Sequence, residues 1–168
     1  RIAGTFPAAT SGSGSSTGEH DTITVKYATA GLAAGSYTAT ITIADANATN
    51  SPQTVAVTLT VTAAAKPAIG RTPTALTPTC VQGQDAADQT FEVWNSAGNG
   101  STLNYTIAVN QPWLSCVPGS GSSTGEHDTI TVKYDTSSLA AGSYSATITI
   151  SDPNASNSPQ TVVVNLTV

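Results

Sequence analysis

Two short clusters of titratable side chains are the places where this sequence could carry out chemistry. Residues 19–21 and 126–128 both read Glu-His-Asp, and general acid–base catalysis and metal binding use such groups. Each cluster stands between a glycine-rich stretch and a predicted strand, and consecutive side chains of a strand point to opposite faces. Three neighbours therefore do not converge on one substrate or ion, and we favour a solvated turn at both clusters.

Two loops are rich in oxygen atoms of the kind that bind calcium. Residues 45–50 and 152–157 contain aspartate, asparagine and hydroxyl side chains, and calcium takes about six to eight oxygen ligands. Their spacing is not that of an EF-hand, and Asp and Asn favour turns in their own right. We therefore predict no metal site. No Gly-x-Ser-x-Gly stretch is followed by a helical pattern, so we also predict no catalytic residues, no enzyme activity and no cofactor.

The two cysteines, Cys80 and Cys116, fit a disulfide better than a metal site. Zinc usually takes about three or four protein ligands, and two isolated cysteines do not supply them. We predict a disulfide bond between them, which indicates an oxidising compartment and a secreted protein. The alternative is two buried thiols that pack as small apolar side chains.

The aromatic residues could form a platform for a sugar. Trp94 lies within an alternating strand, which favours packing in the core. Trp113 follows Pro112 at the edge of a strand and is the better candidate for contact with a glycan, together with Tyr105. A role in the core or at its rim is the favoured alternative for Trp113.

Composition excludes several classes of protein. Charged residues make up 9% of the chain, the net charge is −5 and the isoelectric point is about 4.6. Nucleic-acid binding needs basic surfaces that neutralise phosphates, so we exclude it. No apolar run approaches the ~20 residues of a membrane-spanning helix. The chain contains no methionine, which we interpret as a processed product or a piece of a longer protein.

The chain is organised by an internal repeat. Residues 13–27 recur without change as residues 120–134, and about 40 of 49 positions are identical between 13–61 and 120–168. The constant offset of 107 residues corresponds to one whole domain per copy. We predict an incomplete first copy over 1–61, a linker over 62–67 and a complete domain over 68–168.

The first copy corresponds to the back half of a domain only. Arg1 aligns with Ala108, so the first copy contains no counterpart of 68–107. Either the sequence is cut from a longer array, or strands of another chain complete the half domain. The second explanation is favoured, because Ala9 stands in place of Cys116 and the half copy thus lacks a cysteine that would have no partner.

Alternation of apolar and polar residues predicts strands rather than helices. In residues 129–134 it places Ile130, Val132 and Tyr134 on one face. Similar patterns predict strands over 74–81, 89–94, 103–109, 144–150 and 161–168. Clusters of Gly, Pro, Asn and Asp between them predict turns. About seven short strands in ~100 residues indicate an all-β protein with an immunoglobulin-like β-sandwich.

Several stretches of the second copy carry a recognisable signature. They are Gln-Pro-Trp-Leu-Ser-Cys-Val-Pro-Gly at 111–119, Ile-Thr-Val-Lys-Tyr at 130–134 and Leu-Ala-Ala-Gly-Ser-Tyr at 139–144. With Thr-Phe-Glu-Val-Trp-Asn-Ser at 90–96, they resemble the BACON family of bacterial immunoglobulin-like domains. The resemblance implies an extracellular module and, from domain context, carbohydrate binding; it is specific for a fold rather than an activity. In the first copy, Phe6 and Pro7 depart from the family's Trp-Leu pair.

The half copy leads to our main functional hypothesis, a structural subunit of an extracellular filament or cell-surface fibre. Its inward face lacks the strands that would cover it, and such faces associate. We expect neighbouring copies of the protein to complete it, head to tail. The predicted assembly surface consists of Ile23, Val25, Tyr27, Ile41, Ile43, Val55, Val57 and Leu59.

Two alternative functions stay open. One is a carbohydrate-binding accessory module of a secreted or surface protein, which rests on the family resemblance and on Trp113, Tyr105 and Tyr134. It predicts saturable glycan binding that weakens when Trp113 is replaced by alanine. The other is a passive spacer in a tandem array, which predicts that upstream sequence restores a normal first domain and abolishes association.

Overall fold

The computed structural model describes residues 2–3 and 12–168, and the chain divides into two compact units, Arg1–Ala64 and Ala65–Val168. The division falls within the predicted linker at 62–67. Phe6, Pro7 and Ala9, on which part of the interpretation of the first copy rests, lie outside the described residues. Within the described residues every regular element is a β-strand. No helix that could span a membrane is found among these residues.

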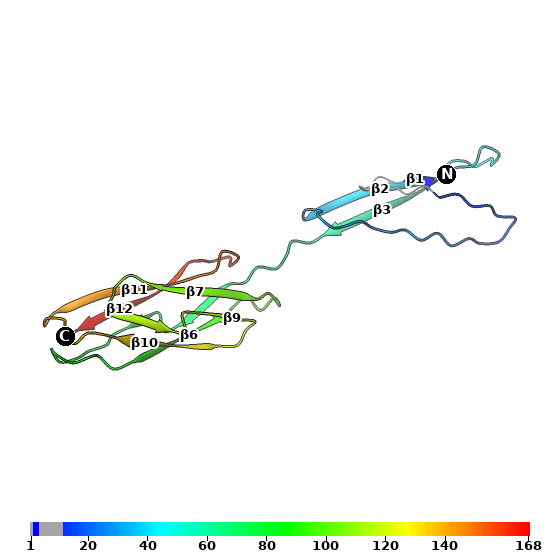
Figure 1. The fold of residues 1–168 in the computed structure, drawn as a ribbon. Helices are drawn as coiled ribbons and strands as arrows, with labels where there is room; N and C mark the ends of the chain where they lie inside the picture. The colour runs from blue at the N-terminus through cyan, green and yellow to red at the C-terminus, as the bar shows by residue number, and fades with distance from the viewer. Residues whose placement is uncertain (1, 4–11) are drawn as a thin grey trace. The chain divides into compact units, whose positions relative to one another are not determined.

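Unit 2 is a β-sandwich (Figure 1). One sheet has the strand order β4 (Ile69–Thr72), β6 (Gln89–Asn95), β10 (Asp128–Tyr134), β8 (Leu114–Val117). The other has the order β5 (Ala75–Leu76), β12 (Gln160–Thr167), β11 (Ser143–Ser151), β7 (Leu103–Val109), β9 (Ser120–Ser123). Paired strands are antiparallel except for β5 and β12. The all-β, immunoglobulin-like architecture predicted from the sequence is confirmed.

Alternate residues of the strands fill the space between the two sheets. Ile130 and Val132 of β10 are fully buried and Tyr134 is 5% exposed, which confirms the face that their alternation predicts. The opposite sheet contributes residues of β7, β11 and β12 to the same cluster. The largest fully buried apolar side chains of unit 2 are Tyr105, Phe91, Leu103, Ile130, Ile148, Ile150 and Leu166.

The first strand of unit 2 differs from the prediction. A single strand was expected over 74–81, but the chain forms β4 before Pro73 and the short β5 after it, in different sheets. Proline has no amide hydrogen for a ladder, so the pairing of β4 with β6 ends at Thr72. The chain then reaches the other sheet, where Thr74 accepts a hydrogen bond from the Val163 amide at 3.0 Å.

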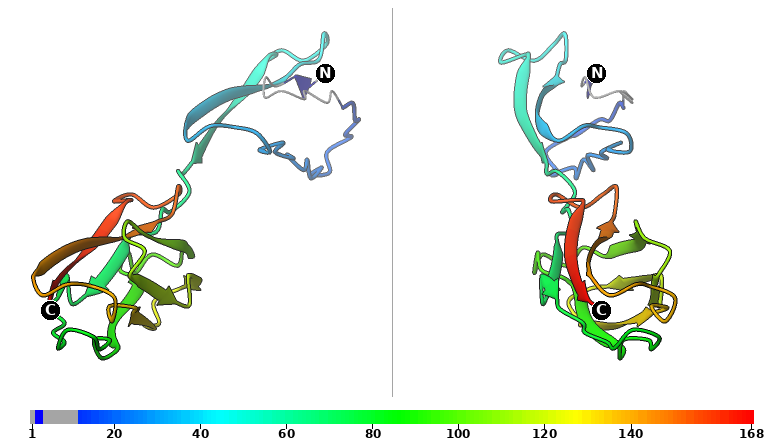
Figure 2. Two further views of the ribbon diagram at one scale, coloured as in Figure 1. Left: turned by 60° about the vertical axis from the view of Figure 1, so that its left-hand side comes forward. Right: turned by 90° about the vertical axis from the view of Figure 1, so that its left-hand side faces the viewer.

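Unit 1 is a single sheet in the described residues (Figure 2). β2 (Gly35–Ile43) pairs with β3 (Gln53–Val61) and with the two-residue β1 (Ile2–Ala3). The hairpin has the register of β11 and β12, since Tyr37 faces Leu59 as Tyr144 faces Leu166. Residues 21–27, which correspond to β10, form no strand. In unit 2 that strand pairs with β6, which has no counterpart in the first copy.

Candidate functional site

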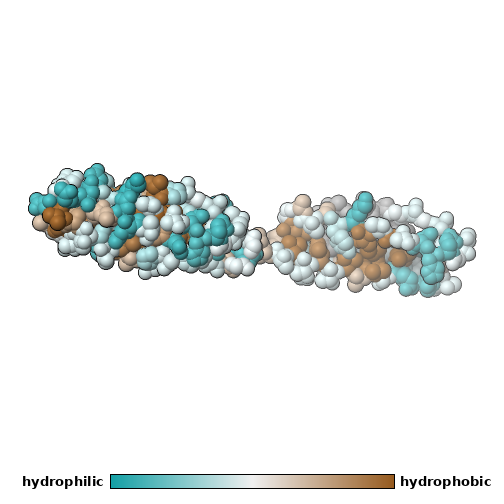
Figure 3. Space-filling view, turned by 90° about the horizontal axis from the view of Figure 1, so that it is seen from below, coloured by the Kyte–Doolittle hydropathy of each residue, from teal (hydrophilic) through white to brown (hydrophobic). Residues whose placement is uncertain are grey.

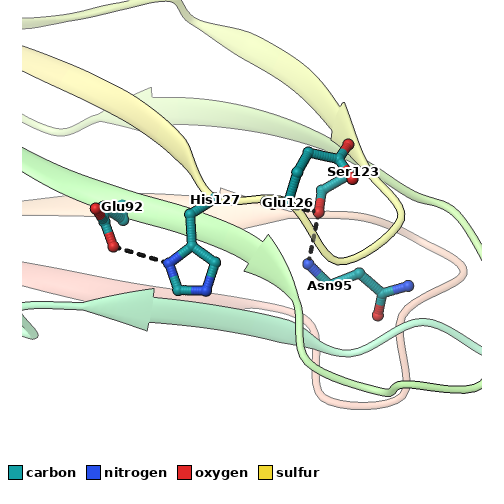
Figure 4. Close-up of polar contacts among 5 residues, drawn as sticks. All are labelled: Glu92, Asn95, Ser123, Glu126 and His127. Carbon is teal, nitrogen blue, oxygen red and sulfur yellow. Dashed lines mark hydrogen bonds and ion pairs between the residues drawn. The ribbon is translucent and has the colours of Figure 1, made fainter.

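A tight turn leads from β9 into β10 and is hydrogen-bonded to the end of β6 (Figure 4). The fully buried Ser123 hydroxyl donates to the Glu126 carbonyl at 2.7 Å and accepts the amides of Gly125 and Asn95, the latter at 2.9 Å. The Glu126 carboxylate accepts the Thr124 amide at 2.9 Å and the Thr124 hydroxyl at 2.8 Å. Hydrogen bonds from its own amide and the Thr124 amide lower the pKa of Glu126. Gly125 has a φ of 147°, which favours glycine.

Ser123 also lies in a Gly-x-Ser-x-Gly stretch at 121–125, the pattern of a nucleophile elbow. In a hydrolase that pattern leads into a helix and exposes the serine oxygen. Here it leads into β10, and the hydroxyl is buried and already holds the turn together. The stretch therefore performs a structural task at this position.

On the outer face of the four-stranded sheet, Trp94 stacks on His127. The two ring centroids are 4.1 Å apart and the rings are inclined by 8°. His127 Nδ1 lies 2.8 Å from Glu92 Oε2, and both side chains are almost half exposed, so this pair contributes little by itself. The predicted core position of Trp94 is wrong. Phe91 and Val93 are the residues of β6 that point into the core, and Trp94 lies on the other face of the strand.

Tyr105 crosses the core of unit 2 to reach the same turn. Its hydroxyl donates to Asp128 Oδ2 at 2.8 Å, and only 1% of the residue is exposed. Burial and the Asp128 carboxylate raise the pKa of Tyr105 well above its usual value. Gly121 makes room for the ring, since a Cβ built on it would stand 2.6 Å from Cζ of Tyr105.

The predicted glycan contacts are therefore corrected. Tyr105 is buried, and Trp113 is 7% exposed and packs edge-on against Tyr144, with 6.5 Å between the ring centroids. Stacking on a sugar needs an accessible ring face, which neither side chain presents. The favoured alternative for Trp113, a place in the core, agrees with its position in the main apolar cluster.

Unit 1 contains the same turn, and none of its described residues forms a strand like β6 or β7 beside it. Ser16 donates to the Glu19 carbonyl at 2.8 Å and accepts the Gly18 amide, as Ser123 does with its neighbours in unit 2. Glu19 accepts the Thr17 amide at 2.8 Å and hydroxyl at 2.9 Å. Hydrogen bonds from its own amide and the Thr17 amide lower the pKa of Glu19. The local sequence thus forms this turn whether or not strands like β6 and β7 lie beside it.

Apolar side chains reach the molecular surface of unit 1 (Figure 3), and five residues of the predicted assembly surface are exposed. Ile23 and Tyr27 are 50% exposed and Val25 is 39% exposed. Their counterparts Ile130, Val132 and Tyr134 are buried. Of the other members, Ile43 and Val55 are exposed, and Ile41, Val57 and Leu59 are half-buried.

The two cysteines are free thiols in the structure, so the predicted disulfide is not present. Cys80 follows the bridge between Thr79 and the end of β12, and its sulfur lies 3.5 Å from the Thr136 hydroxyl. Cys116 lies in β8 at the edge of the other sheet. Both pack against the apolar core, which is the alternative interpretation, and burial raises the pKa of Cys116 to about 11.

The Asp-rich loop between β11 and β12 uses its carboxylate to hold backbone. Asp152 is 1% exposed, and its two oxygens accept the amides of Asn104 and Asn154, each at 2.8 Å. The side chain therefore joins β7 to the loop. In the part of the chain that the structure describes, no group of three or more His, Cys, Asp or Glu side chains is placed to hold a metal ion.

No protein-family model matches this sequence, and no curated relative matches it. A solved protein of unknown function from Porphyromonas gingivalis W83 has a TM-score of 0.52 at 13% identity, over 82% of this chain and 68% of its own. A Bacteroides ovatus protein, provisionally described as carbohydrate-binding, has a TM-score of 0.50 at 13% identity, over 60% of this chain and 37% of its own.

A Bacteroides ovatus xyloglucanase is also similar, with a TM-score of 0.45 at 11% identity, over 60% of this chain. This chain spans 19% of that enzyme and 55% of the periplasmic chaperone SfaE, another structural neighbour. At such identities the first two likenesses show a similar fold and nothing finer. Membership of the BACON family stays a prediction.

Proposed function

We propose that this protein is a structural subunit of an extracellular filament or cell-surface fibre, joined to its neighbours by completion of unit 1. The observation that carries the proposal is a comparison of identical residues. Ile23, Val25 and Tyr27 are 39–50% exposed, whereas the same three residues of unit 2 are at most 5% exposed. An exposed apolar face of this kind favours association with strands that resemble those covering the same residues in unit 2.

Donor strands of the β4–β7 type would stabilise unit 1 in two ways. Burial of a valine or isoleucine side chain contributes about 1.5–3 kcal/mol when it is complete. Residues 21–27 also carry the backbone groups that β10 pairs with β6, from Asp128 opposite Val93 to Val132 opposite Gln89. Addition of such a strand satisfies the ladder and the side chains together.

A folded copy cannot supply these strands from its own unit 2. The segment from β4 to β7 already covers the core of that sandwich. Its transfer to another copy's unit 1 completes one sandwich and opens another, so the buried apolar area does not grow. In the proposed fibre, the donor strands for unit 1 are therefore strands of the neighbouring subunit other than those that already cover the core of its unit 2.

The composition of the chain bears on its location, and the burial of its aromatic residues bears on the competing functions. Low charge, at 9%, and a surface of Thr, Ser, Asn and Gly suit the close packing of like modules at a cell surface. The carbohydrate-binding alternative is less well supported, because Trp113 and Tyr105 are buried. The passive spacer differs from the fibre subunit in where the donor strands originate, and two variants of the chain reproduce the two arrangements.

The experiment supplies the donor at one end of the chain or the other. A second copy of residues 62–107 attached after Val168 gives each chain a donor for the next chain's unit 1. Residues 67–107 placed ahead of Arg1 complete unit 1 within the same chain, because Arg1 aligns with Ala108. We expect filaments or closed rings from the first variant by electron microscopy at micromolar concentration, and monomers from the second by sedimentation. A monomeric first variant, or filaments from the second, would show that unit 1 is not the joint.

A further inference from the structure

We infer that unit 1 carries a preformed receptor for one kind of donor, a strand pair that bears the aromatic and amide groups of β6 and β7. The receptor turn consists of Gly14, Ser16, His20 and Asp21. This inference rests on the proposed function and names the partner of the same surface. That partner is a donor of this repeat type, with the sequence Glu-x-Trp-Asn and a tyrosine ten residues later, rather than any apolar strand.

The first element of the receptor turn is a slot for a tyrosine. In unit 2 the slot lies between Gly121, whose missing Cβ leaves room for Tyr105, and Asp128, which accepts the tyrosine hydroxyl at 2.8 Å. In unit 1 a Cβ on Gly14 would meet, among the described residues beyond its chain neighbours, only Asp21 Oδ2 at 3.8 Å. The acceptor therefore lies beside Gly14, and none of the described residues takes the place that the tyrosine ring has in unit 2.

The second element is a hydroxyl that already has the correct orientation. Ser123 accepts the Asn95 amide at 2.9 Å while it holds its own turn, and Ser16 is held by the corresponding bonds at 2.8 and 3.3 Å. A donor amide thus meets an acceptor that does not have to rearrange. Such preorganisation lowers the entropy that association costs.

The third element is the imidazole that precedes the acceptor strand. His127 stacks on Trp94 and pairs with Glu92, both of which belong to β6. His20 occupies the same place in unit 1 and is exposed there. A donor tryptophan and glutamate two residues apart on the outward face of a strand therefore find their partner on the receptor. The polar contacts give register, which an apolar face alone specifies weakly.

Glycine at position 14 provides the sharpest test, because a Cβ there would enter the place that the donor's tyrosine ring has to occupy. In the variant with residues 62–107 attached after Val168, we expect Gly14→Ala to weaken assembly at least tenfold, measured by sedimentation over a concentration series. Gly12→Ala is the matched control, since its Cβ would meet nothing within 4 Å in unit 1 and its counterpart Gly119 has only a contact of 3.9 Å. The control should assemble like the parent.

A change in the donor checks that the effect arises in the slot. Replacing the appended copy's tyrosine, the one that corresponds to Tyr105, by alanine should remove the added effect of Gly14→Ala. Gly14→Ala in the 168-residue chain should leave the unfolding of unit 2, followed by its tryptophan fluorescence, unchanged. If both glycine variants assemble equally well, the receptor is disproved while the proposed joint stands. If the parent does not assemble at all, the proposed function itself fails.

Discussion

Gly70 of β4 lies against the indole of Trp94 on the neighbouring strand β6, and a Cβ built on Gly70 would stand 2.6 Å from Nε1 of that ring. From the side of β10 the indole is stacked on His127 at 4.1 Å. The ring is therefore confined between two strands, and only a residue without a Cβ allows the approach.

Gly70→Ala should accordingly lower the free energy of unfolding of unit 2 by about 1–3 kcal/mol, because the ring has to leave its position. Urea unfolding followed by tryptophan fluorescence measures this, since Trp94 and Trp113 both lie in unit 2. On a Trp94→Ala background, with Trp113 as the probe, the same alanine should cost less than about 0.5 kcal/mol. If the costs of Gly70→Ala and Trp94→Ala are additive in the double variant, Gly70 does not pack against the Trp94 indole.

Identical isoleucines in the two units should respond differently to truncation. Ile130→Ala removes a fully buried side chain and should destabilise unit 2 by about 2–5 kcal/mol. Ile23 is 50% exposed, so Ile23→Ala should change the stability of the 168-residue chain by less than about 0.5 kcal/mol. With residues 67–107 ahead of Arg1, Ile23→Ala should cost as much as Ile130→Ala does. Calorimetry compares the three variants with their two parent chains, and an unchanged small cost for Ile23→Ala in the extended chain would mean that the added strands do not cover unit 1.

The two Asp loops offer a second matched pair. Asp152→Ala removes a buried carboxylate and leaves the Asn104 amide without its acceptor, and should destabilise unit 2 by about 1–3 kcal/mol. Asp45 also caps its loop, by accepting the Asn47 amide at 2.7 Å, but the loop is exposed. Asp45→Ala should therefore cost less than about 1 kcal/mol, because water replaces the lost acceptor. Equal effects in thermal unfolding would exclude a role for burial at Asp152.

Features set by neighbours in the chain could be predicted from the sequence. The alternation of Ile130, Val132 and Tyr134 predicts a strand and its inward face, and both are present in unit 2, although the identical stretch 21–27 forms no strand in unit 1, so this strand also depends on its partner. The tyrosine that begins each hairpin forms the same local bond in both units, from Tyr37 to the Ala33 carbonyl at 2.8 Å and from Tyr144 to the Ala140 carbonyl at 2.9 Å. Such contacts need no tertiary partner, so they recur wherever the sequence recurs.

Contacts between distant strands were predicted less well. In β6, Trp94 alternates with Thr90 and Glu92, so it lies on the same outward face as these two polar residues. The sequence contains this signal, but the prediction placed Trp94 in the core because its ring is large and apolar. Its partner His127 lies 33 residues further along the chain, and no local pattern links the two. The disulfide prediction was wrong for a related reason. Two cysteines in a chain suggest a bonded pair, but only the arrangement of the strands decides whether their sulfur atoms come within bonding distance.

The stability of unit 2 should fall in alkaline solution through groups that are buried in their neutral form. Burial raises the pKa of Cys116 from 9.0 to about 11; burial, with the negative charges of Cys116 and Asp88, raises that of Tyr134 from 10.0 to about 12. A raised pKa means that the folded state binds the proton more tightly than the unfolded state. The stability from Cys116 is therefore fully present below pH 9 and is lost as the pH rises through 11, and the stability from Tyr134 is lost between 10 and 12.

Urea unfolding of the reduced protein between pH 8 and 11 measures this loss. Cys116→Ala removes one of these titrations and leaves those of Tyr134 and Tyr105, whose pKa is also raised, so the free energy of unfolding of this variant should fall less steeply between pH 9 and 10 than that of the parent. If Cys116→Ala has the same slope as the parent, the Cys116 thiol is not buried as the structure places it.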